Sequence, residues 1–254
     1  MLDPTSRFSN RVDNYVKYRP SYPPEIIPLL GSECGLTPQS VIADLGSGTG
    51  LFSELFLKHG NQVFGVEPNA GMRAAGERVL AKYRKFTSVS AAAEATTLPD
   101  DSIDFVVAGQ AFHWFDRDKA RIEFERILKT EGWVVLAWNG FRVESSPLSG
   151  AYQELVVRYG TDYKEVSREI NGCDVEPFYA PGSCKCARFR FQQVFDYEGL
   201  KGRLLSASYA PDPQHPSYEP MIDDLRVIFE AHQKGGKVNF DYETEVYYGQ
   251  LGSP

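Results

Sequence analysis

The chain has 254 residues and a formal net charge of −7, from 27 basic and 34 acidic side chains. Hydrophobic residues at 42% and charged residues at 24% are ordinary for a globular protein, so intrinsic disorder, collagen-like repeats and a coiled coil are excluded. The acidic balance argues against a protein that mainly binds nucleic acid, because such binding depends on clustered lysines and arginines.

The hydrophobic pattern alternates between strands and helices through the first half of the chain. It predicts a lead-in helix over 24–30, a strand over 40–45, a helix from Leu51 to a stop at Gly60, and a strand over 62–66. A helix capped by Asn69 follows, and then strands near 86–90 and over 103–108. The last elements of this half are a helix capped by Asp116 and ended by Gly132, and a strand over 133–138. Such alternation, with nearly continuous apolar strands, indicates a doubly wound α/β fold whose mostly parallel sheet is covered by helices on both faces.

The second half of the chain is less regular. Residues 141–182 read as an irregular insert with one helix near 148–158, followed by strand patterns over 188–195 and 238–248. Helices near 198–206 and 218–233 separate those two strands, which we expect to form a hairpin-like pair at the sheet edge. The expected division is one domain, 1–254, with an N-terminal lid and lead-in helix (1–39), a core (40–140), a cap insert (141–182), and C-terminal helices with the edge hairpin (183–254).

Membrane and secretion signals are absent from the pattern. No apolar run approaches the roughly 18–20 residues of a membrane helix, and MLDPTSRFSN lacks the apolar segment of a secretory signal. The four cysteines, Cys34, Cys173, Cys184 and Cys186, have no neighbouring histidine that would complete a zinc site. We therefore expect a cytoplasmic protein with free thiols, no metal and no membrane partner.

The chemical centre is the turn after the first core strand, Asp44-Leu45-Gly46-Ser47-Gly48-Thr49-Gly50. Leu51 stands where a dinucleotide fingerprint needs its last glycine, and no G-K-[ST] follows to make a P-loop. A pyrophosphate beside Asp44 would be repelled, at about 4 kcal/mol for like charges ~4 Å apart near a protein surface. A ligand with a cationic end, such as S-adenosylmethionine, is favoured; the alternative is that Asp44 only serves the turn or the helix dipole.

Glu67 closes the second core strand in Val63-Phe64-Gly65-Val66-Glu67-Pro68. It lies about twenty residues beyond the loop, where a doubly wound fold places the carboxylate that accepts both ribose hydroxyls. A surface glutamate that merely ends a strand is the alternative.

The ordered series of motifs over roughly 41–139 resembles class I S-adenosylmethionine-dependent methyltransferases of the small-molecule, UbiE-like branch (methyltransferase type 11). The series comprises the loop at 44–50, Gly65-Val66-Glu67-Pro68, Ala93-Glu94, 98–104 and 127–132. The segments QAFHWF at 110–115 and YxxYRPxYP at 15–23 further resemble trans-aconitate-type enzymes. Ser47, and Thr130-Glu131-Gly132 in place of Pro-Gly-Gly, are mild departures from the family pattern. The resemblance implies a Rossmann-like sheet of seven strands with a reversed final hairpin.

The resemblance also implies S-adenosylmethionine as cofactor, S-adenosylhomocysteine as product, and a role for each matching residue. Gly46 and Gly48 lie under the methionine part, Glu67 with Pro68 holds the ribose, Ala93 and Glu94 meet the adenine, and Gln110 faces the methionine end. The Arg19 guanidinium can pair with the cofactor's carboxylate while Tyr15 and Tyr18 cover the site as a lid. A surface salt bridge is the other interpretation of Arg19.

On the acceptor side we expect a small molecule. The Pro-Pro-Tyr signature and strand-end cysteine of nucleic-acid methyltransferases are missing. A carboxylate acceptor is already ionised and needs no base, whereas a hydroxyl or amine would. For His113 we weigh positioning of the acceptor, general-base catalysis and simple core packing. Trp114, Phe115, Trp138 and Phe141 are candidates for an apolar acceptor wall, and Arg142 for an anchor of an anionic acceptor.

Two other classes of function remain open at this point. One is an NAD(P)-dependent oxidoreductase on the same kind of sheet, which Leu51 and Asp44 both disfavour. The other is a non-catalytic protein that keeps the cofactor pocket and has lost the chemistry, which the intact loop and the aromatic acceptor region disfavour.

Overall fold

The computed structural model describes residues 11–164 and 174–252. Cys173 and the first ten residues of the expected lid lie outside these ranges. Seven strands form one sheet in the order β3-β2-β1-β4-β5-β7-β6. The strands are β1 Val41–Leu45, β2 Gln62–Val66, β3 Phe86–Val89, β4 Ile103–Gly109, β5 Leu128–Phe141, β6 Cys184–Phe195 and β7 Val238–Gly249. β1 to β5 are mutually parallel, while β7 runs antiparallel to both β5 and β6, which confirms the predicted fold.

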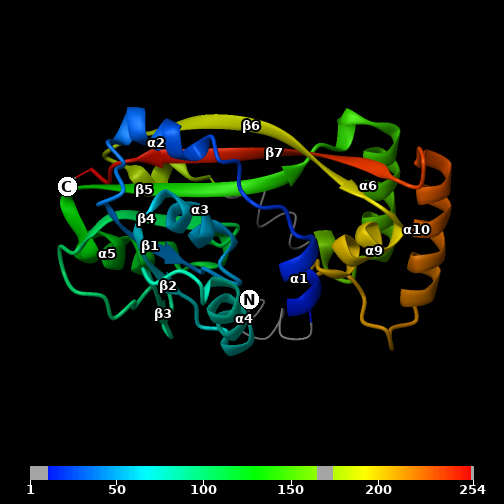
Figure 1. Cartoon of the computed structure of the whole chain (residues 1–254), viewed down its shortest axis with the longest axis horizontal. Helices are drawn as coiled ribbons and strands as arrows, with labels where there is room; N and C mark the ends of the chain where they lie inside the picture. Colours follow the sequence, from blue (N-terminus) through cyan, green and yellow to red (C-terminus); the bar gives the residue numbers. More distant parts are fainter. Residues whose placement is uncertain (1–10, 165–173, 253–254) are drawn as a thin grey trace.

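Helices cover both faces of the sheet and create a core on each (Figure 1). Their bounds are α1 Val12–Tyr18, α2 Ile26–Cys34, α3 Leu51–His59, α4 Ala70–Leu80, α5 Arg117–Ile127, α6 Pro147–Tyr159, α8 Glu176–Tyr179, α9 Tyr197–Leu205 and α10 Tyr218–His232, with short 3₁₀ helices η1 Phe112–Trp114 and η2 Val143–Ser145. α2 and α3 pack on one face, and α5 and α8 on the other. Within the described ranges, no helix is long and apolar enough to cross a bilayer.

Local capping signals place most helix ends where the sequence predicts them. Asn69 accepts a hydrogen bond from the Met72 N–H at the start of α4, and Asp116 accepts one from the Lys119 N–H at the start of α5. Gly60 ends α3 in the left-handed conformation, with φ of 101°. These positions are set by short-range chemistry, so the sequence alone is enough to find them.

The predicted end of α5 at Gly132 is wrong. The helix stops at Ile127, and β5 begins at Leu128, which pairs with Ile103 of β4. The register then shifts, so that Trp133 faces Phe105 and the intervening residues form a bulge. Strand pairing therefore overrides the helical pattern that continues through Leu128. β6 likewise begins at Cys184, earlier than the predicted start at 188.

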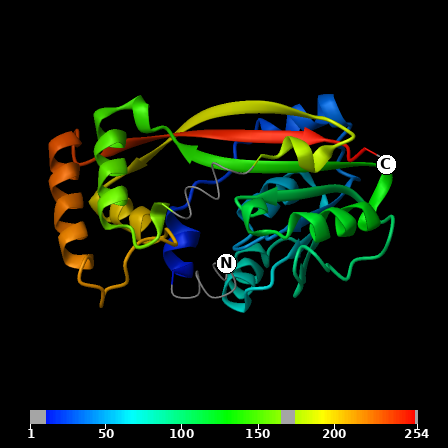
Figure 2. The same cartoon turned by 180° about the vertical axis from the view of Figure 1, so that it is seen from behind.

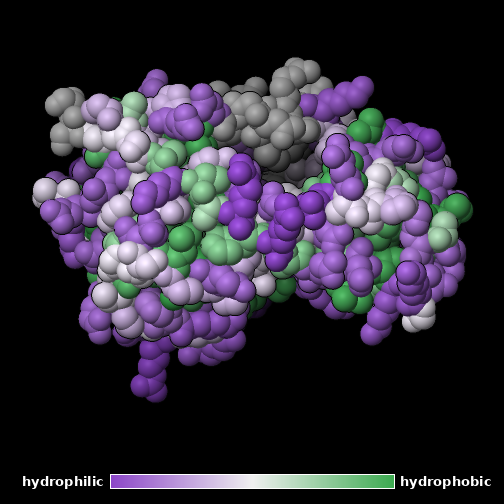
Figure 3. Space-filling view, turned by 90° about the horizontal axis from the view of Figure 1, so that it is seen from above, coloured by the Kyte–Doolittle hydropathy of each residue, from purple (hydrophilic) through white to green (hydrophobic). Residues whose placement is uncertain are grey.

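Strands β5, β6 and β7 are much longer than the other four and extend beyond them (Figures 1 and 2). Their far ends carry a second lobe made of α1, α6, α9 and α10, which we call the cap. The cap has its own apolar core, formed by α6, α9, α10 and the ends of β6 and β7. Seen from above, an indentation separates the cap from the larger lobe (Figure 3). The segment 141–182 thus supplies α6 to the cap, whereas its α8 packs beneath the sheet.

The N-terminal helix α1 is docked on α9 of the cap. Arg11 donates hydrogen bonds to the Ala207 and Ala210 carbonyls at 2.6 and 2.7 Å, and Arg19 donates to the Ser206 carbonyl at 3.1 Å. Tyr18 lies so close to Gly202 that a Cβ there would be 2.0 Å from its ring. The segment that we expect to act as a lid is therefore packed as part of the cap.

Replacing Gly202 by alanine is expected to loosen α1, because the new methyl group would overlap the Tyr18 ring. Hydrogen exchange of the amides in 12–18 should become faster, and the affinity for S-adenosylhomocysteine should fall, since α1 leads into Arg19. Gly150→Ala in α6 is the matched control: a Cβ there meets nothing within 4 Å, so it should be neutral or stabilise the helix by up to about 1 kcal/mol. Unchanged protection of α1 in Gly202→Ala would show that the ring simply moves aside.

Candidate functional site

The glycine loop between β1 and α3 is held in a conformation that other residues rarely adopt. Gly46, Gly48 and Gly50 have φ of 68°, 55° and 84°. A Cβ on Gly46 would lie 2.6 Å from the Cβ of Ala111, so a side chain is excluded there by contact as well as by conformation. The N–H groups of Gly46 and Ser47 both donate to the Val66 carbonyl, at 2.9 and 3.1 Å, which fixes the loop to the end of β2.

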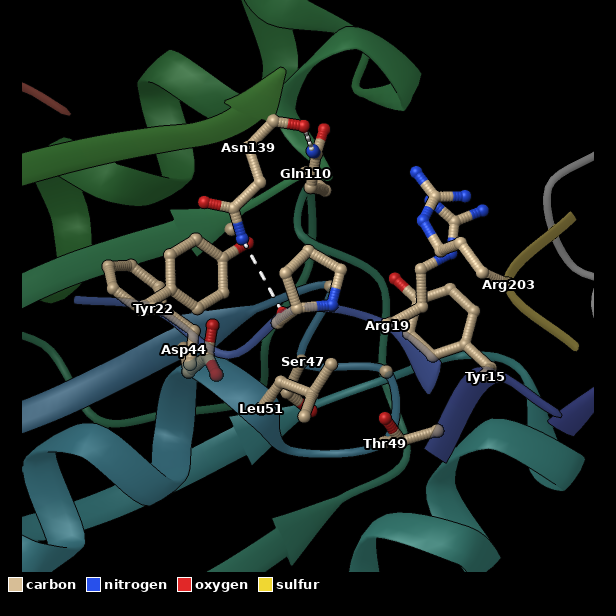
Figure 4. A pocket seen from close by; sticks show the side chains of 15 residues that line it. Tyr15, Arg19, Tyr22, Asp44, Ser47, Thr49, Leu51, Gln110, Asn139 and Arg203 are labelled. Atoms are coloured by element: carbon tan, nitrogen blue, oxygen red, sulfur yellow. Dashed lines mark hydrogen bonds between the residues drawn. The ribbon is translucent and has the colours of Figure 1, made fainter. Parts of the chain in front are cut away.

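Two cavities open on either side of this loop and share Tyr15, Gly46, Gly48, Gly109 and Gln110 in their walls. The inner cavity, of about 40 Å³, lies between the loop, α1 and the cap, and is also lined by Arg19, Tyr22, Asp44, Asn139 and Arg203 (Figure 4). The outer cavity, of about 260 Å³, is also lined by Glu67, Pro68, Asn69, Met72, Ala93, Glu94, Trp114 and Phe115. The two cavities together form one elongated site across the carboxyl ends of the strands.

Asp44, at the end of β1, is buried in the inner cavity with one oxygen satisfied. Its Oδ2 accepts a hydrogen bond of 2.6 Å from the Ser53 hydroxyl, and its Oδ1 has no hydrogen-bond partner. Burial raises the pKa of Asp44 to about 7, although the Ser53 hydrogen bond opposes this. A cationic group placed against Oδ1 would supply the missing partner and favour the ionised carboxylate.

Glu67 has both carboxylate oxygens occupied by backbone. Oε2 accepts from the Gly48 N–H and Oε1 from the Asn69 N–H, each at 2.8 Å. Burial raises the pKa of Glu67, against the effect of those two hydrogen bonds. The side chain lines the outer cavity, as expected for a ribose ligand, and it also ties the glycine loop to the segment that starts α4.

Two guanidinium groups face the inner cavity beside each other, Arg19 after α1 and Arg203 from α9 (Figure 4). Arg203 is only 4% exposed; its Nε donates to the Tyr242 hydroxyl at 2.8 Å and its Nη1 has no hydrogen-bond partner. The Nε of Arg19 is also unpartnered, and burial together with the Arg203 charge lowers the pKa of Arg19. Among the described residues, no carboxylate forms an ion pair with either group, so the surface salt bridge considered for Arg19 is not formed.

Gln110 and Asn139 stand at the carboxyl ends of β4 and β5, opposite the loop. Gln110 has a positive φ of 57°, and its Nε2 donates to the backbone carbonyl of Asn139 at 2.7 Å. Asn139 is fixed in turn by the Thr244 hydroxyl, which donates to its Oδ1 at 2.6 Å. Both side chains line the inner cavity, and Asn139, across the cavity from the two arginines, also donates from Nδ2 to the Pro20 and Ser21 carbonyls at 3.5 and 3.4 Å (Figure 4).

The residues predicted for the acceptor side do not lie together. Trp114 lines the outer cavity, whereas Trp138 and Arg142 line a separate groove along β5 and β7. His113 lies on η1 and lines neither cofactor cavity; its Nδ1 is buried without a hydrogen-bond partner. Burial, helped by Arg117, lowers the pKa of His113 to about 4, so the imidazole is neutral at pH 7. Tyr18 contacts α9 and lines neither cavity.

Several residues of the site were not predicted from the sequence. Tyr22 lies inside the 15–23 motif and Asn139 directly follows Trp138, so the residues around them were a usable signal. Arg203 lies on a cap helix with no motif around it, and only the docking of the cap brings it to the loop.

The arrangement fits S-adenosylmethionine. In the outer cavity Glu67 can accept from ribose hydroxyls beside an apolar wall suited to an adenine. In the inner cavity the unpartnered Asp44 Oδ1 can accept from an ammonium group, and Arg19 can pair with a carboxylate.

Binding of S-adenosylhomocysteine is expected to strengthen with pH because of Asp44. Below about pH 7 this carboxyl is mostly protonated in the free protein, and it must lose a proton before it pairs with the ligand's ammonium group. The dissociation constant measured by calorimetry should fall by about tenfold between pH 6 and pH 8. Asp44→Asn should bind more weakly at pH 8 and show a flat profile. An equal pH dependence in both proteins would exclude Asp44 as the titrating group.

Glu67→Gln is expected to weaken both the loop and the ligand site, since an amide cannot accept from two N–H groups through both of its terminal atoms. Denaturant unfolding without ligand should show a loss of about 1–3 kcal/mol, and the affinity for S-adenosylhomocysteine should fall more than tenfold. Glu77→Gln, on the exposed side of α4, is the control and should change neither quantity. Normal stability with reduced affinity would mean that the carboxylate serves the ligand alone.

Comparison with known proteins also indicates a methyltransferase. The methyltransferase domain family matches residues 43–136. An uncharacterised methyltransferase of Schizosaccharomyces pombe is 35% identical over 248 residues, which cover 94% of this chain and 95% of that protein. An uncharacterised methyltransferase of Mycobacterium tuberculosis is 33% identical over 137 residues, 54% of each chain.

The fold is also similar to that of a solved protein from Anaeromyxobacter dehalogenans, named provisionally as a type II methyltransferase. The TM-score is 0.70 at 20% identity, and the alignment covers 92% of this chain and 98% of the other. With the S. pombe relative aligned along almost its whole length, the chain belongs to the S-adenosylmethionine-dependent methyltransferases.

Proposed function

We propose that the methyl acceptor is a small anionic molecule and that a carboxylate oxygen receives the methyl group. The observation that carries this proposal is the charge of the inner cavity. Arg19 and Arg203 face it without a carboxylate partner in the described chain, and Asp44 is the one acidic side chain among its described lining residues. Because Asp44 pairs with the cofactor's ammonium group, an anionic acceptor is needed to offset the remaining positive charge.

Methyl transfer requires the protein mainly to align the acceptor oxygen with the methyl group of the cofactor. S-adenosylmethionine supplies a methyl group on a positively charged sulfur; as a carboxylate oxygen forms the O–C bond, the C–S bond breaks and leaves its electron pair on sulfur, giving a methyl ester and S-adenosylhomocysteine. No proton has to be removed from the acceptor. Gln110 keeps one N–H of its amide beyond that bonded to Asn139, and this donor can orient the acceptor in the cavity.

The state of His113 favours a carboxylate over a hydroxyl or amine. A base whose conjugate acid has a pKa of about 4 is poorly matched to removing a proton from either group at neutral pH. Since His113 lines neither cofactor cavity, we assign its neutral imidazole a role in packing η1 beside the site, without contact to the acceptor.

The test is a screen of metabolite extracts with S-adenosylmethionine labelled in the methyl group. The labelled product should be released as methanol by mild alkali, as a methyl ester requires, and kcat should be nearly flat between about pH 6 and pH 8. His113→Gln should retain much of this activity. A label stable to alkali, with a rate that climbs through one ionisation and disappears in His113→Gln, would instead establish transfer to a hydroxyl or amine.

A further inference from the structure

The chain crosses from the cap to the larger lobe at residues 19–21. Before this crossing, α1 is docked on α9 of the cap, and the Arg19 side chain donates to the Ser206 carbonyl there. After it, Tyr22 is buried in the apolar core that α2 and α3 form on the sheet. Arg19, which we expect to pair with the carboxylate of the cofactor, therefore stands at the cap end of a short link between the lobes. The position of that link decides where its guanidinium lies in the inner cavity.

Asn139 of β5 holds this link from the sheet side. Its Nδ2 donates to the carbonyls of Pro20 and Ser21, at 3.5 and 3.4 Å, from across the cavity (Figure 4). These are the two residues that directly follow Arg19, and the ring of Pro20 fixes its φ, so the backbone between the contacts and Arg19 has little freedom. Both hydrogen bonds are at the long end of the normal range, as is common in a site without its ligand.

The direction of the Asn139 amide is set by Thr244 of β7. Thr244 lies opposite Asn139 in the pairing of β5 with β7 and is fully buried, and its hydroxyl donates to Oδ1 at 2.6 Å. With the amide reversed, Oδ1 would face two carbonyl oxygens, and none of these three atoms can donate. The hydroxyl and the two carbonyls thus agree on one orientation, in which Nδ2 is directed at the link.

We propose that Asn139 is a positioning residue for the cofactor. Through the carbonyls of Pro20 and Ser21 it holds Arg19 where the guanidinium meets the carboxylate of S-adenosylmethionine, and Thr244 in turn holds Asn139. Asn139 acts on the cofactor only through Arg19. This inference rests on the cofactor and not on the nature of the acceptor, so the result of the acceptor screen does not affect it.

The test is a double-mutant cycle on the full chain, with the affinity for S-adenosylhomocysteine measured by calorimetry. Asn139→Ala should weaken binding about three- to tenfold, the range of one hydrogen bond, and Arg19→Gln should weaken it more than tenfold. In the Arg19→Gln protein, adding Asn139→Ala should cost less than about twofold, because no guanidinium is left to position. Two fully multiplicative losses would overturn the proposal, since Asn139 would then act independently of Arg19. Wild-type affinity in either single variant would overturn it as well.

Variants of Thr244 test the second step of the proposal. Thr244→Val keeps the shape of the side chain without the hydroxyl, and it should weaken S-adenosylhomocysteine binding in the same way as Asn139→Ala. Thr244→Ser keeps the hydroxyl and should bind as the wild type does. Asn239→Ala, at an exposed asparagine of β7, is the matched control and should also leave the affinity unchanged. Equal affinities of Thr244→Val and the wild type would overturn the role of Thr244.

A loss of stability is separated from a loss of positioning by a further variant. Asn139→Ala leaves the buried Thr244 hydroxyl without its acceptor, which lowers stability in denaturant. Asn139→Ala combined with Thr244→Val removes both partners and should recover that stability. Its affinity for S-adenosylhomocysteine should stay as low as that of Asn139→Ala, because Nδ2 is still missing. An affinity that recovers together with the stability would mean that Asn139 serves the fold alone, and the proposal would be wrong.

Discussion

The carboxylate of Glu67 joins two stretches of backbone that the cofactor site needs in fixed positions. It accepts from the N–H of Gly48 in the glycine loop and from the N–H of Asn69 before α4. Because the carboxylate is buried, it needs hydrogen-bond donors, and the two N–H groups need acceptors. The two hydrogen bonds meet both needs. Since Gly46 also bonds to the end of β2, the loop is held on both sides. Gly46 and Gly48 of this loop line both cavities, so the shape of the cavities depends on these hydrogen bonds.

Local signals were sufficient for the core of the fold and for the cofactor half of the site. The loop, Glu67 and the caps at Asn69 and Asp116 are all defined by a few adjacent residues. Both caps form, and the loop and Glu67 line the outer cavity, while their contacts with the cofactor stay predictions. The end of α5 was not predictable in this way. Leu128 pairs with Ile103 of β4, although its spacing from the preceding apolar residues is that of a helix.

The acceptor half of the site depends on contacts between distant segments, which a single sequence does not reveal. Trp138 was expected near the acceptor at the predicted end of a core strand, and Arg142 just beyond it. β5 continues to Phe141, however, and takes both side chains into another groove. Arg203 lines the same cavity as the loop because α9 packs against α1, where Gly202 allows Tyr18 to approach.

The attachment of the cap has a mechanical consequence. The inner cavity, at about 40 Å³, has room for only a few water molecules, and Arg203 of the cap forms part of its wall. Strands β5, β6 and β7 form a three-stranded ribbon that links the lobes, and its hydrogen-bonded register resists sliding but tolerates bending and twisting. Because α1 is bonded to α9, Arg19 travels with the cap. Bending of the ribbon would therefore move both arginines relative to the glycine loop in one motion.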